Sequence, residues 1–166
     1  MTLIRPERPE DFEQVFEVNA AAFASEDEAK LVDKLRQVDG CISLVAESDG
    51  RIIGHISFSP LTLNDRSTFF TGLAPMSVLP EHQTHGIGSK LVESGLSACR
   101  DAGHTAVFVV GHAAYYPRFG FRPAADMGFT CEYPVPPDNF LALELVNDSL
   151  AGQSGLIKYD PVFAGF

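Results

Sequence analysis

The sequence predicts a mixed α/β or α+β fold in which helices flank a central mixed sheet. Three observations predict it: two helical patterns lie near the N-terminus, a β-meander follows them, and a strand–helix–strand unit comes next. The strands of that unit run from residue 69 to 78 and from 106 to 110. Because such units join parallel strands by right-handed crossovers, we expect these two strands to be parallel neighbours.

The first elements are a short strand and two helices. Thr2–Arg5 is β-like, and Pro9-Glu10-Asp11 opens a helix, because proline suits the first turn and acidic side chains suit its positive end. Residues at helical spacing follow, apolar except for the asparagine: Phe12, Val15, Phe16, Asn19 and Phe23. Ser25 and Glu28 have the spacing of a capping box for the second helix. Its inner face is predicted at Leu31, Leu35 and Val38.

A hairpin comes next. Asp49-Gly50 is a strong turn signal between strands at 43–47 and 51–59. Period two places one set of side chains on a common face of the second strand: Ile52, Gly54, Ile56 and Phe58. In the strand Phe69–Val78, Pro75 has no N–H group for a ladder hydrogen bond. It therefore predicts either an edge position or a bulge.

The long helix is expected from Gly86 to about Ala102, and Gly103 ends it. Its inward residues are Leu91, Val92, Gly95, Leu96 and Cys99. The later elements are a strand covered on both faces at Ala106–Val110, a loop or short helix at Gly111–Arg118, and strands at Phe140–Leu145 and Leu156–Tyr159.

Composition limits the function. The 166 residues fit one domain, and a net charge of −10 argues against nucleic acid as a partner while favouring a cationic acceptor. No apolar run approaches the ~20 residues of a membrane helix, and the N-terminus has no signal core, so we expect a soluble, cytoplasmic protein with no membrane partner. No CxxC, HxH, HxxxH or GxSxG pattern occurs, so neither a metal site nor a serine hydrolase is expected.

The most informative segment is Gln83-Thr84-His85-Gly86-Ile87-Gly88, which joins a strand to the long helix. N–H groups at a helix start form an anion site. The two glycines permit positive φ and close approach of a phosphate, and His85 or Lys90 could add charge. Glycine at a helix start also serves as a plain cap. GxxxxGK[ST] does not occur, and GxGxxG fails at Leu91.

Two segments resemble a known family. Gln83-x-x-Gly86-x-Gly88 resembles the (Arg/Gln)-x-x-Gly-x-(Gly/Ala) loop of the GNAT superfamily of acyl-CoA N-acyltransferases, and Tyr116-Pro117-Arg118-Phe119-Gly120-Phe121 resembles its Tyr-x-x-x-Gly-Phe segment. The resemblance in element order covers about residues 3–121 and is vaguer beyond Tyr133. It implies one N-acetyltransferase domain over residues 1–166, acetyl-CoA as co-substrate without a metal, and a primary amine of a small molecule or protein as acceptor. A homodimer is compatible with it.

The resemblance also implies a site. Family members hold acetyl-CoA in a V-shaped gap between two splayed parallel strands, here 69–78 and 106–110. The main chain of Met76, Ser77 and Val78 would pair with the pantetheine arm. The pyrophosphate would lie on the amides of Gln83, Thr84, His85, Gly86, Ile87, Gly88 and Ser89. Tyr116 matches the tyrosine that protonates the leaving thiolate, and the adjacent Tyr115 is the alternative.

One departure leaves the function open. Many members place a general-base glutamate on the strand before the glycine loop, but residues 69–78 contain no acid. The alternatives are a water held by backbone carbonyls or one of four side chains: Glu28, Glu47, His55 and His112. The missing acid also allows a catalytically weak CoA-binding or CoA-sensing domain of the same fold.

Overall fold

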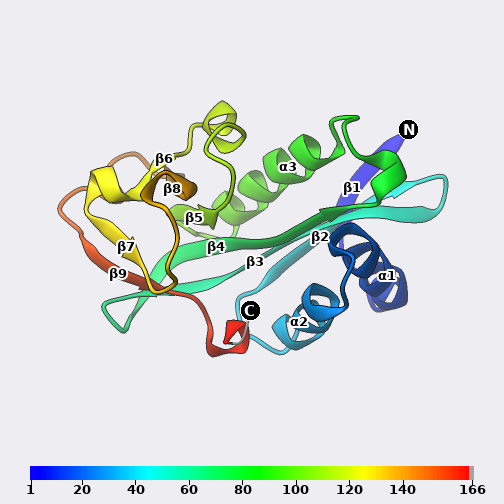
Figure 1. The fold of residues 1–166 in the computed structure, drawn as a ribbon, viewed down its shortest axis with the longest axis horizontal. Coiled ribbons are helices and arrows are strands. Elements are labelled where there is room, and N and C mark those ends of the chain that lie inside the picture. The colour runs from blue at the N-terminus through cyan, green and yellow to red at the C-terminus, as the bar shows by residue number, and fades with distance from the viewer. Residues whose placement is uncertain (165–166) are drawn as a thin grey trace.

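One mixed sheet organises residues 1–164, which the computed structural model describes (Figure 1). The strands are β1 (Thr2–Pro6), β2 (Ile42–Ser48), β3 (Arg51–Leu63), β4 (Arg66–Val78), β5 (Ala106–Val110), β6 (Arg122–Pro123), β7 (Phe129–Cys131), β8 (Phe140–Glu144) and β9 (Gly155–Lys158). The main path runs β1-β2-β3-β4-β5-β8-β6, and β9 pairs with β3 and β7. Helix α3 (Ile87–Asp101) covers one face, and α1 (Phe12–Phe23) and α2 (Asp27–Leu35) cover the other (Figure 1).

Helix α1 packs on the sheet through a narrower face than its aromatic residues suggest. Val15, Val18 and Asn19 are at most 2% exposed, whereas Phe12 and Phe23 are 38% and 39% exposed. The Phe12 ring lies under the guanidinium of Arg36, 3.9 Å from ring centroid to Cζ, and so packs on α2's end instead of the core. The helix was predicted, but two of its five periodic residues do not face the sheet.

The predicted capping box of α2 is wrong. Ser25 Oγ accepts a hydrogen bond from the N–H of Asp27 at 3.2 Å, but Glu28 does not bond back to Ser25. One carboxylate oxygen of Glu28 is instead buried with no hydrogen-bond partner in residues 1–164. Leu31 and Leu35 are buried as predicted, and Val38 lies beyond the helix end.

The β2–β3 hairpin and an irregularity in β4 at Pro75 are both present, as the sequence predicts. Asp49 and Gly50 both have positive φ, as a type I′ turn requires. In the β3–β4 ladder, Ile56 pairs with Met76 and Phe58 with Leu73, so two β4 residues, including Pro75, oppose one β3 residue. Pro75 therefore lies in a bulge. The edge alternative is wrong because β4 runs between β3 and β5.

Strands β4 and β5 are parallel neighbours, as the strand–helix–strand unit predicts. Their pairing runs from Phe70 with Ala106 to Leu73 with Val109 and then stops. Strand β4 continues to Val78, still paired to β3, without a β5 partner in the described chain. An unpaired stretch of backbone on a central strand is thus available to a ligand.

The C-terminal part completes the sheet. The predicted strands at 140–145 and 156–159 are observed as β8, antiparallel to β5, and β9, parallel to β7. Strands β6 and β7 were not predicted, because two or three residues carry no readable periodicity. A cluster of four aromatic rings ties these strands to β4 and β5: Phe70, Phe108, Phe129 and Phe140.

Candidate functional site at the start of helix α3

The first turn of α3 is an open donor site. Gly86 is the N-cap residue at φ +81, and a Cβ there would meet no atom within 4 Å. No side chain caps this end, so the first N–H groups of the helix are free for an anion. Both glycines of the loop permit a positive φ, but only Gly86 adopts one, and Gly88 has ordinary helical backbone geometry. A Cβ at Gly88 would lie 3.5 Å from the Tyr115 hydroxyl, so glycine at this position leaves open space between the helix and that hydroxyl.

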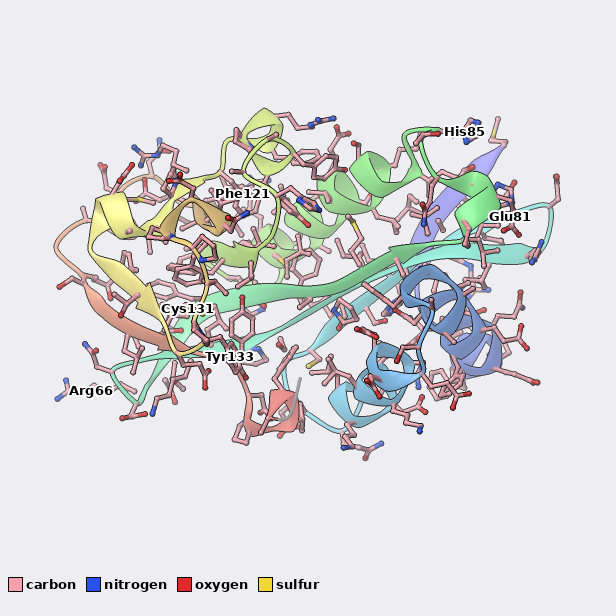
Figure 2. The ribbon with its side chains drawn as sticks, viewed as in Figure 1. Arg66, Glu81, His85, Phe121, Cys131 and Tyr133 are labelled. Carbon is pink, nitrogen blue, oxygen red and sulfur yellow. The ribbon has the colours of Figure 1, made fainter. Side chains whose placement is uncertain are left out.

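A cavity of about 290 Å³ adjoins this helix start. It brings together Val78, His82, Gln83, Thr84, Gly86, Ile87, Gly88, Ser89, Tyr115 and Arg118. Three predicted cofactor residues do not line it. His85 is exposed at the outer edge of the loop (Figure 2), Ser77 is buried, and Met76 lies beneath Gly88. The cavity therefore joins most of the predicted loop residues to the segment that follows β5.

Arg118 supplies the cationic group of this cavity, although no sequence pattern marked it as a site residue. Its Nε donates to the carbonyl of Tyr115 at 2.8 Å, and its guanidinium lies 4.3 Å from the centroid of the Tyr115 ring. Gln83 Nε2 donates to the carbonyl of Val78 at 3.0 Å and so ties the loop to the end of β4. A local positive group and free amides can hold an anion despite the net charge of −10.

The two adjacent tyrosines have different surroundings. The Tyr115 hydroxyl lies 2.9 Å from Ser89 Oγ, over the first turn of α3. Tyr116 is 7% exposed and packs on Phe119, Phe121 and Gly111, the residue that follows β5. A Cβ at Gly111 would come within 2.4 Å of the Tyr116 ring, so Gly111 leaves room for it. Burial, with a smaller contribution from Tyr115, raises the pKa of Tyr116 to about 12, and its phenol stays protonated at neutral pH.

Two of the four candidates for the general base, His55 and Glu47, make side-chain contacts within the fold. His55 is fully buried, with Nδ1 3.3 Å from Asn19 Nδ2 and Nε2 2.8 Å from Ser43 Oγ. Burial, followed by the charge of Arg36, lowers the pKa of His55 to about 3. Glu47 accepts a hydrogen bond from Arg5 Nη2 at 3.1 Å. Neither side chain lines a cavity found at β4 and β5.

The other two candidates are less constrained. His112 is exposed two residues after β5. Glu28 is partly buried and carries the unpartnered oxygen described above. On α2, Glu28 shares a face with Leu31 and Leu35, which pack in the same apolar cluster as Tyr159 and Phe163.

A second cavity, of about 270 Å³, lies where β4 and β5 part. Leu73 and Ala74 of β4 and Val110 of β5 form one wall. The C-terminal part forms the other with Tyr133, Val135, Tyr159 and Phe163, and Figure 2 labels Tyr133 among them. We call this cavity the apolar chamber. No sequence pattern indicates this chamber, because its walls come from segments up to about 90 residues apart.

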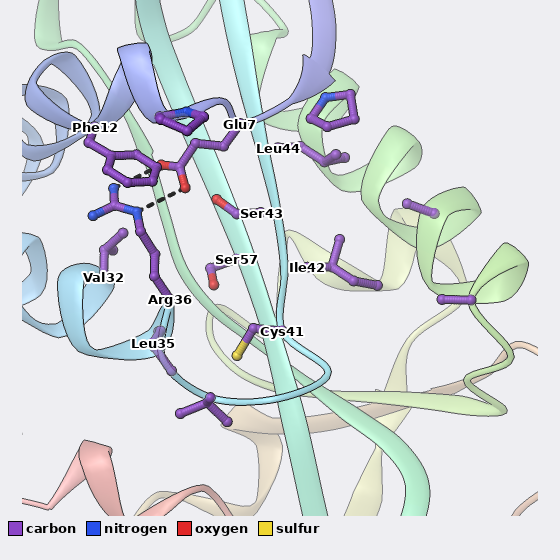
Figure 3. A pocket seen from close by; sticks show the side chains of 15 residues that line it. Glu7, Phe12, Val32, Leu35, Arg36, Cys41, Ile42, Ser43, Leu44 and Ser57 are labelled. Carbon is purple, nitrogen blue, oxygen red and sulfur yellow. Dashed lines mark hydrogen bonds and ion pairs between the residues drawn. The ribbon is translucent and has the colours of Figure 1, made fainter.

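A larger cavity of about 530 Å³ lies between α1, α2 and the start of β2 (Figure 3). Arg36 crosses it and pairs with Glu7 through two hydrogen bonds of 3.0 and 2.9 Å. Burial raises the pKa of Cys41 in its wall to about 11, so this thiol is a poor nucleophile. No predicted site residue lines this cavity, although Ser43, which does, lies beside His55, with 2.8 Å between Ser43 Oγ and His55 Nε2. No residue of β4 or β5 lines it either.

Residues 1–164 contain neither a helix able to cross a membrane nor a side-chain cluster able to hold a metal ion. No helix there has both the length and the apolar character that a membrane crossing needs. Within the same residues, no group of three or more histidine, cysteine, aspartate or glutamate side chains is arranged to hold a metal ion.

Comparison with known proteins gives consistent results. A family model described as "Acetyltransferase (GNAT) domain" matches residues 3–124. The chain is 34% identical to the "Uncharacterized N-acetyltransferase YhbS" of Escherichia coli K12 over 99% of both chains. It is 38% identical to the "Uncharacterized N-acetyltransferase YjhQ" of the same organism over 78% of this chain and 75% of the relative.

Solved structures agree. The crystal structure of Escherichia coli YhbS in complex with CoA matches with a TM-score of 0.94 and 36% identity, covering 99% of this chain and 93% of that one. A GNAT-family acetyltransferase from Brucella melitensis in complex with acetyl-CoA matches with a TM-score of 0.83 and 35% identity, covering 98% of each chain.

Proposed function

The chain belongs to the GNAT family of acetyltransferases, and on this premise we propose that it transfers the acetyl group of acetyl-CoA to a primary amine of a small molecule or protein. The observation that carries the proposal is the uncapped start of α3 beside the point where β4 loses its β5 partner. The first feature suits a pyrophosphate, and the second suits an extended amide-bearing arm.

We place acetyl-CoA along these two features. Its pyrophosphate would lie in the cavity on residues 83–89, with Arg118 as counter-charge. The pantetheine arm would follow the unpaired edge of β4 past Met76, Ser77 and Val78, and the thioester would reach the β4–β5 opening near Tyr116. Tyr115, which is hydrogen-bonded to Ser89, would lie on the side of the site that holds the pyrophosphate.

The reaction needs a free amine and a stabilised leaving group. The amine nitrogen attacks the thioester carbonyl, and the tetrahedral intermediate expels the CoA thiolate. An alkyl amine with a pKa near 10.4 is a free base only about once in a few thousand molecules at pH 7, so a base must remove a proton. Among the described side chains, Glu28 and His112 remain candidates beside a bound water.

Tyr116 is the proposed donor to the thiolate. With a phenol pKa of about 12 against an ordinary thiol value of roughly 8.5, full proton transfer is uphill by roughly 3.5 units, or about 5 kcal/mol. Burial of the sulfur in the gap narrows that difference. A hydrogen bond from the protonated phenol stabilises the charge developing on sulfur without a completed transfer.

The test is acetyl-CoA binding followed by turnover. At a hundred times its dissociation constant, acetyl-CoA should add about 2.7 kcal/mol to the free energy of unfolding, and ATP at the same concentration should add much less. CoA release with a panel of primary amines should then exceed release without amine. Binding without amine-dependent release would favour the alternative, a catalytically weak CoA-binding or CoA-sensing domain. Equal stabilisation by ATP would contradict both.

Two further expectations stay predictions. A cytoplasmic location is tested by fractionating the source cells and following the protein by immunoblot. A homodimer is tested by light scattering of the purified chain with and without CoA.

A further inference from the structure

The apolar chamber borders the reacting end of the proposed site. Leu73 is the last β4 residue paired to β5, and Ala74 is the next residue along β4. Val110 ends β5 and is 41% exposed. A group bound in the chamber would therefore lie beside the opening in which the thioester is proposed to lie, and this inference rests on the proposed function.

The chamber wall is selective for apolar groups. Among residues 1–164, every side chain that lines it is aliphatic or aromatic, and none carries a formal charge at neutral pH. Three rings meet there, with centroid distances of 6.1 Å between Tyr133 and Tyr159 and 5.2 Å between Tyr159 and Phe163. A charged group would lose its hydration in the chamber without gaining a partner. An aromatic ring would gain both apolar contact and edge-to-face contacts.

The size of the chamber limits the occupant. Its volume of about 270 Å³ is at the lower end of the roughly 300–1,000 Å³ of small-molecule pockets. A single ring with a short side arm suits it better than a drug-sized molecule or a folded protein surface.

Tyr159, whose ring lines the chamber, carries a buried hydroxyl. The Tyr159 side chain is 8% exposed, and its hydroxyl is buried with no hydrogen bond in the described part of the chain. Burial, followed by the nearby Cys131 and Tyr133, raises the pKa of Tyr159, so the phenol remains a donor at neutral pH. This hydroxyl is closed to solvent, so Tyr159 contributes its ring to the chamber wall.

We propose that the apolar chamber binds the carrier group of the acceptor, and that the preferred acceptor is a primary amine on a short arm attached to one aromatic ring. The ring would contact Tyr159 and Phe163, and the amine would lie at the β4–β5 opening, outside the apolar wall. Polyamines and strongly hydrophilic amines would bind poorly, because they would bring a charge or hydroxyl into the chamber.

The experiment compares matched primary amines on the CoA-loaded protein. Phenethylamine, ethanolamine and 1,4-diaminobutane are titrated by calorimetry against the CoA complex, and kcat/KM is measured for each with acetyl-CoA. Phenethylamine should bind at least about tenfold more tightly than the other two, since even one methylene in an apolar pocket changes discrimination about 10–200-fold.

Variants assign the effect to the chamber. Val135→Asp places a charge in the wall, in a segment between two prolines without regular structure. It should weaken phenethylamine binding at least about tenfold and leave acetyl-CoA binding unchanged. Val146→Asp, at an apolar residue that is 51% exposed and does not line the chamber, is the matched control and should change neither.

The outcomes separate this inference from the proposed function. Equal binding of the three amines, or phenethylamine binding that Val135→Asp leaves intact, overturns the chamber assignment even if acetyl transfer proceeds. Failure of acetyl-CoA to bind the wild-type chain overturns the proposed function, and the chamber assignment with it.

Discussion

Tyr116 and Tyr115 lie next to each other, but their contacts predict different kinetic effects. Tyr116→Phe keeps the ring on Phe119 and Phe121 and deletes only the hydroxyl. We expect kcat to fall about 10²–10⁴-fold with little change in acetyl-CoA affinity. The measurement is steady-state kinetics under conditions where chemistry limits the rate.

Tyr115→Phe is the matched control, because it removes the hydroxyl bonded to Ser89 over the helix start. It should raise the KM for acetyl-CoA more than it lowers kcat. The reverse pattern, with kcat lost in the Tyr115 variant and retained in the Tyr116 variant, would exchange the two roles.

The buried His55 makes the free energy of unfolding depend on pH. Its pKa is about 3 in the folded chain against an ordinary value of 6.5, so below pH 6.5 the unfolded state binds a proton that the folded state does not. Stability from the neutral imidazole is therefore present above pH 6.5 and is lost as pH falls toward 3. Between pH 6.5 and 4.5 the loss is about 2–3 kcal/mol. Urea unfolding of wild type and His55→Gln at both pH values measures the difference, and equal pH slopes would refute it.

The site residues differ in how far sequence could identify them. Gln83, Gly86 and Gly88 are close in sequence and start a helix, so a short motif contains their whole geometry. The ring nitrogens of His55 contact Asn19 and Ser43, which come from separate elements, and Arg118 stacks on the Tyr115 ring. Contacts of that kind appear only after the chain folds, so the base candidates could not be separated by sequence.

Helix α3 offers a matched pair of glycines for testing the cofactor site. Gly86 and Gly103 lie at opposite ends of the helix, with φ of +81 and +92, and a Cβ at either would meet no protein atom within 4 Å. Replacing each by alanine should cost a similar strain, about 1–2 kcal/mol of unfolding free energy. Only Gly86→Ala also places a methyl group in the cavity at the helix start. It should weaken acetyl-CoA binding at least about tenfold by calorimetry, and equal affinities in the two variants would contradict the placement.

Secondary structure was predictable where an element is long and its burial periodic. The inner face of α3 is buried from Leu91 to Cys99 as predicted, and β5 has the predicted bounds. The errors occur where a tertiary contact replaces a local one. Phe12 of α1 packs under Arg36, and one carboxylate oxygen of Glu28 is buried instead of capping α2. Helix propensity and residue spacing contain no information about such tertiary arrangements.

The whole chain is predicted to be one domain although the family match ends at residue 124. Strand β8 pairs with β5 along its full length, and β9 pairs with the end of β3. The aromatic cluster around Phe108 joins strands from both parts of the chain. Separate unfolding of the C-terminal part would expose that cluster, so a single cooperative transition is expected.

The distribution of chromophores allows a direct test of this cooperativity. The α-helices lie between residues 12 and 101, so far-UV circular dichroism at 222 nm reports mainly on the N-terminal part. The chain has no tryptophan, and its four tyrosines all lie from residue 115 onward, so tyrosine fluorescence reports on the C-terminal part. The two urea curves should coincide.

Phe108→Ala should shift both curves together by about 3–5 kcal/mol, because it opens a cavity between the two parts of the chain. Phe69→Ala, at a 71% exposed ring, should shift neither by more than about 0.5 kcal/mol. Two separated transitions, or a Phe108→Ala shift confined to fluorescence, would divide the chain into two units.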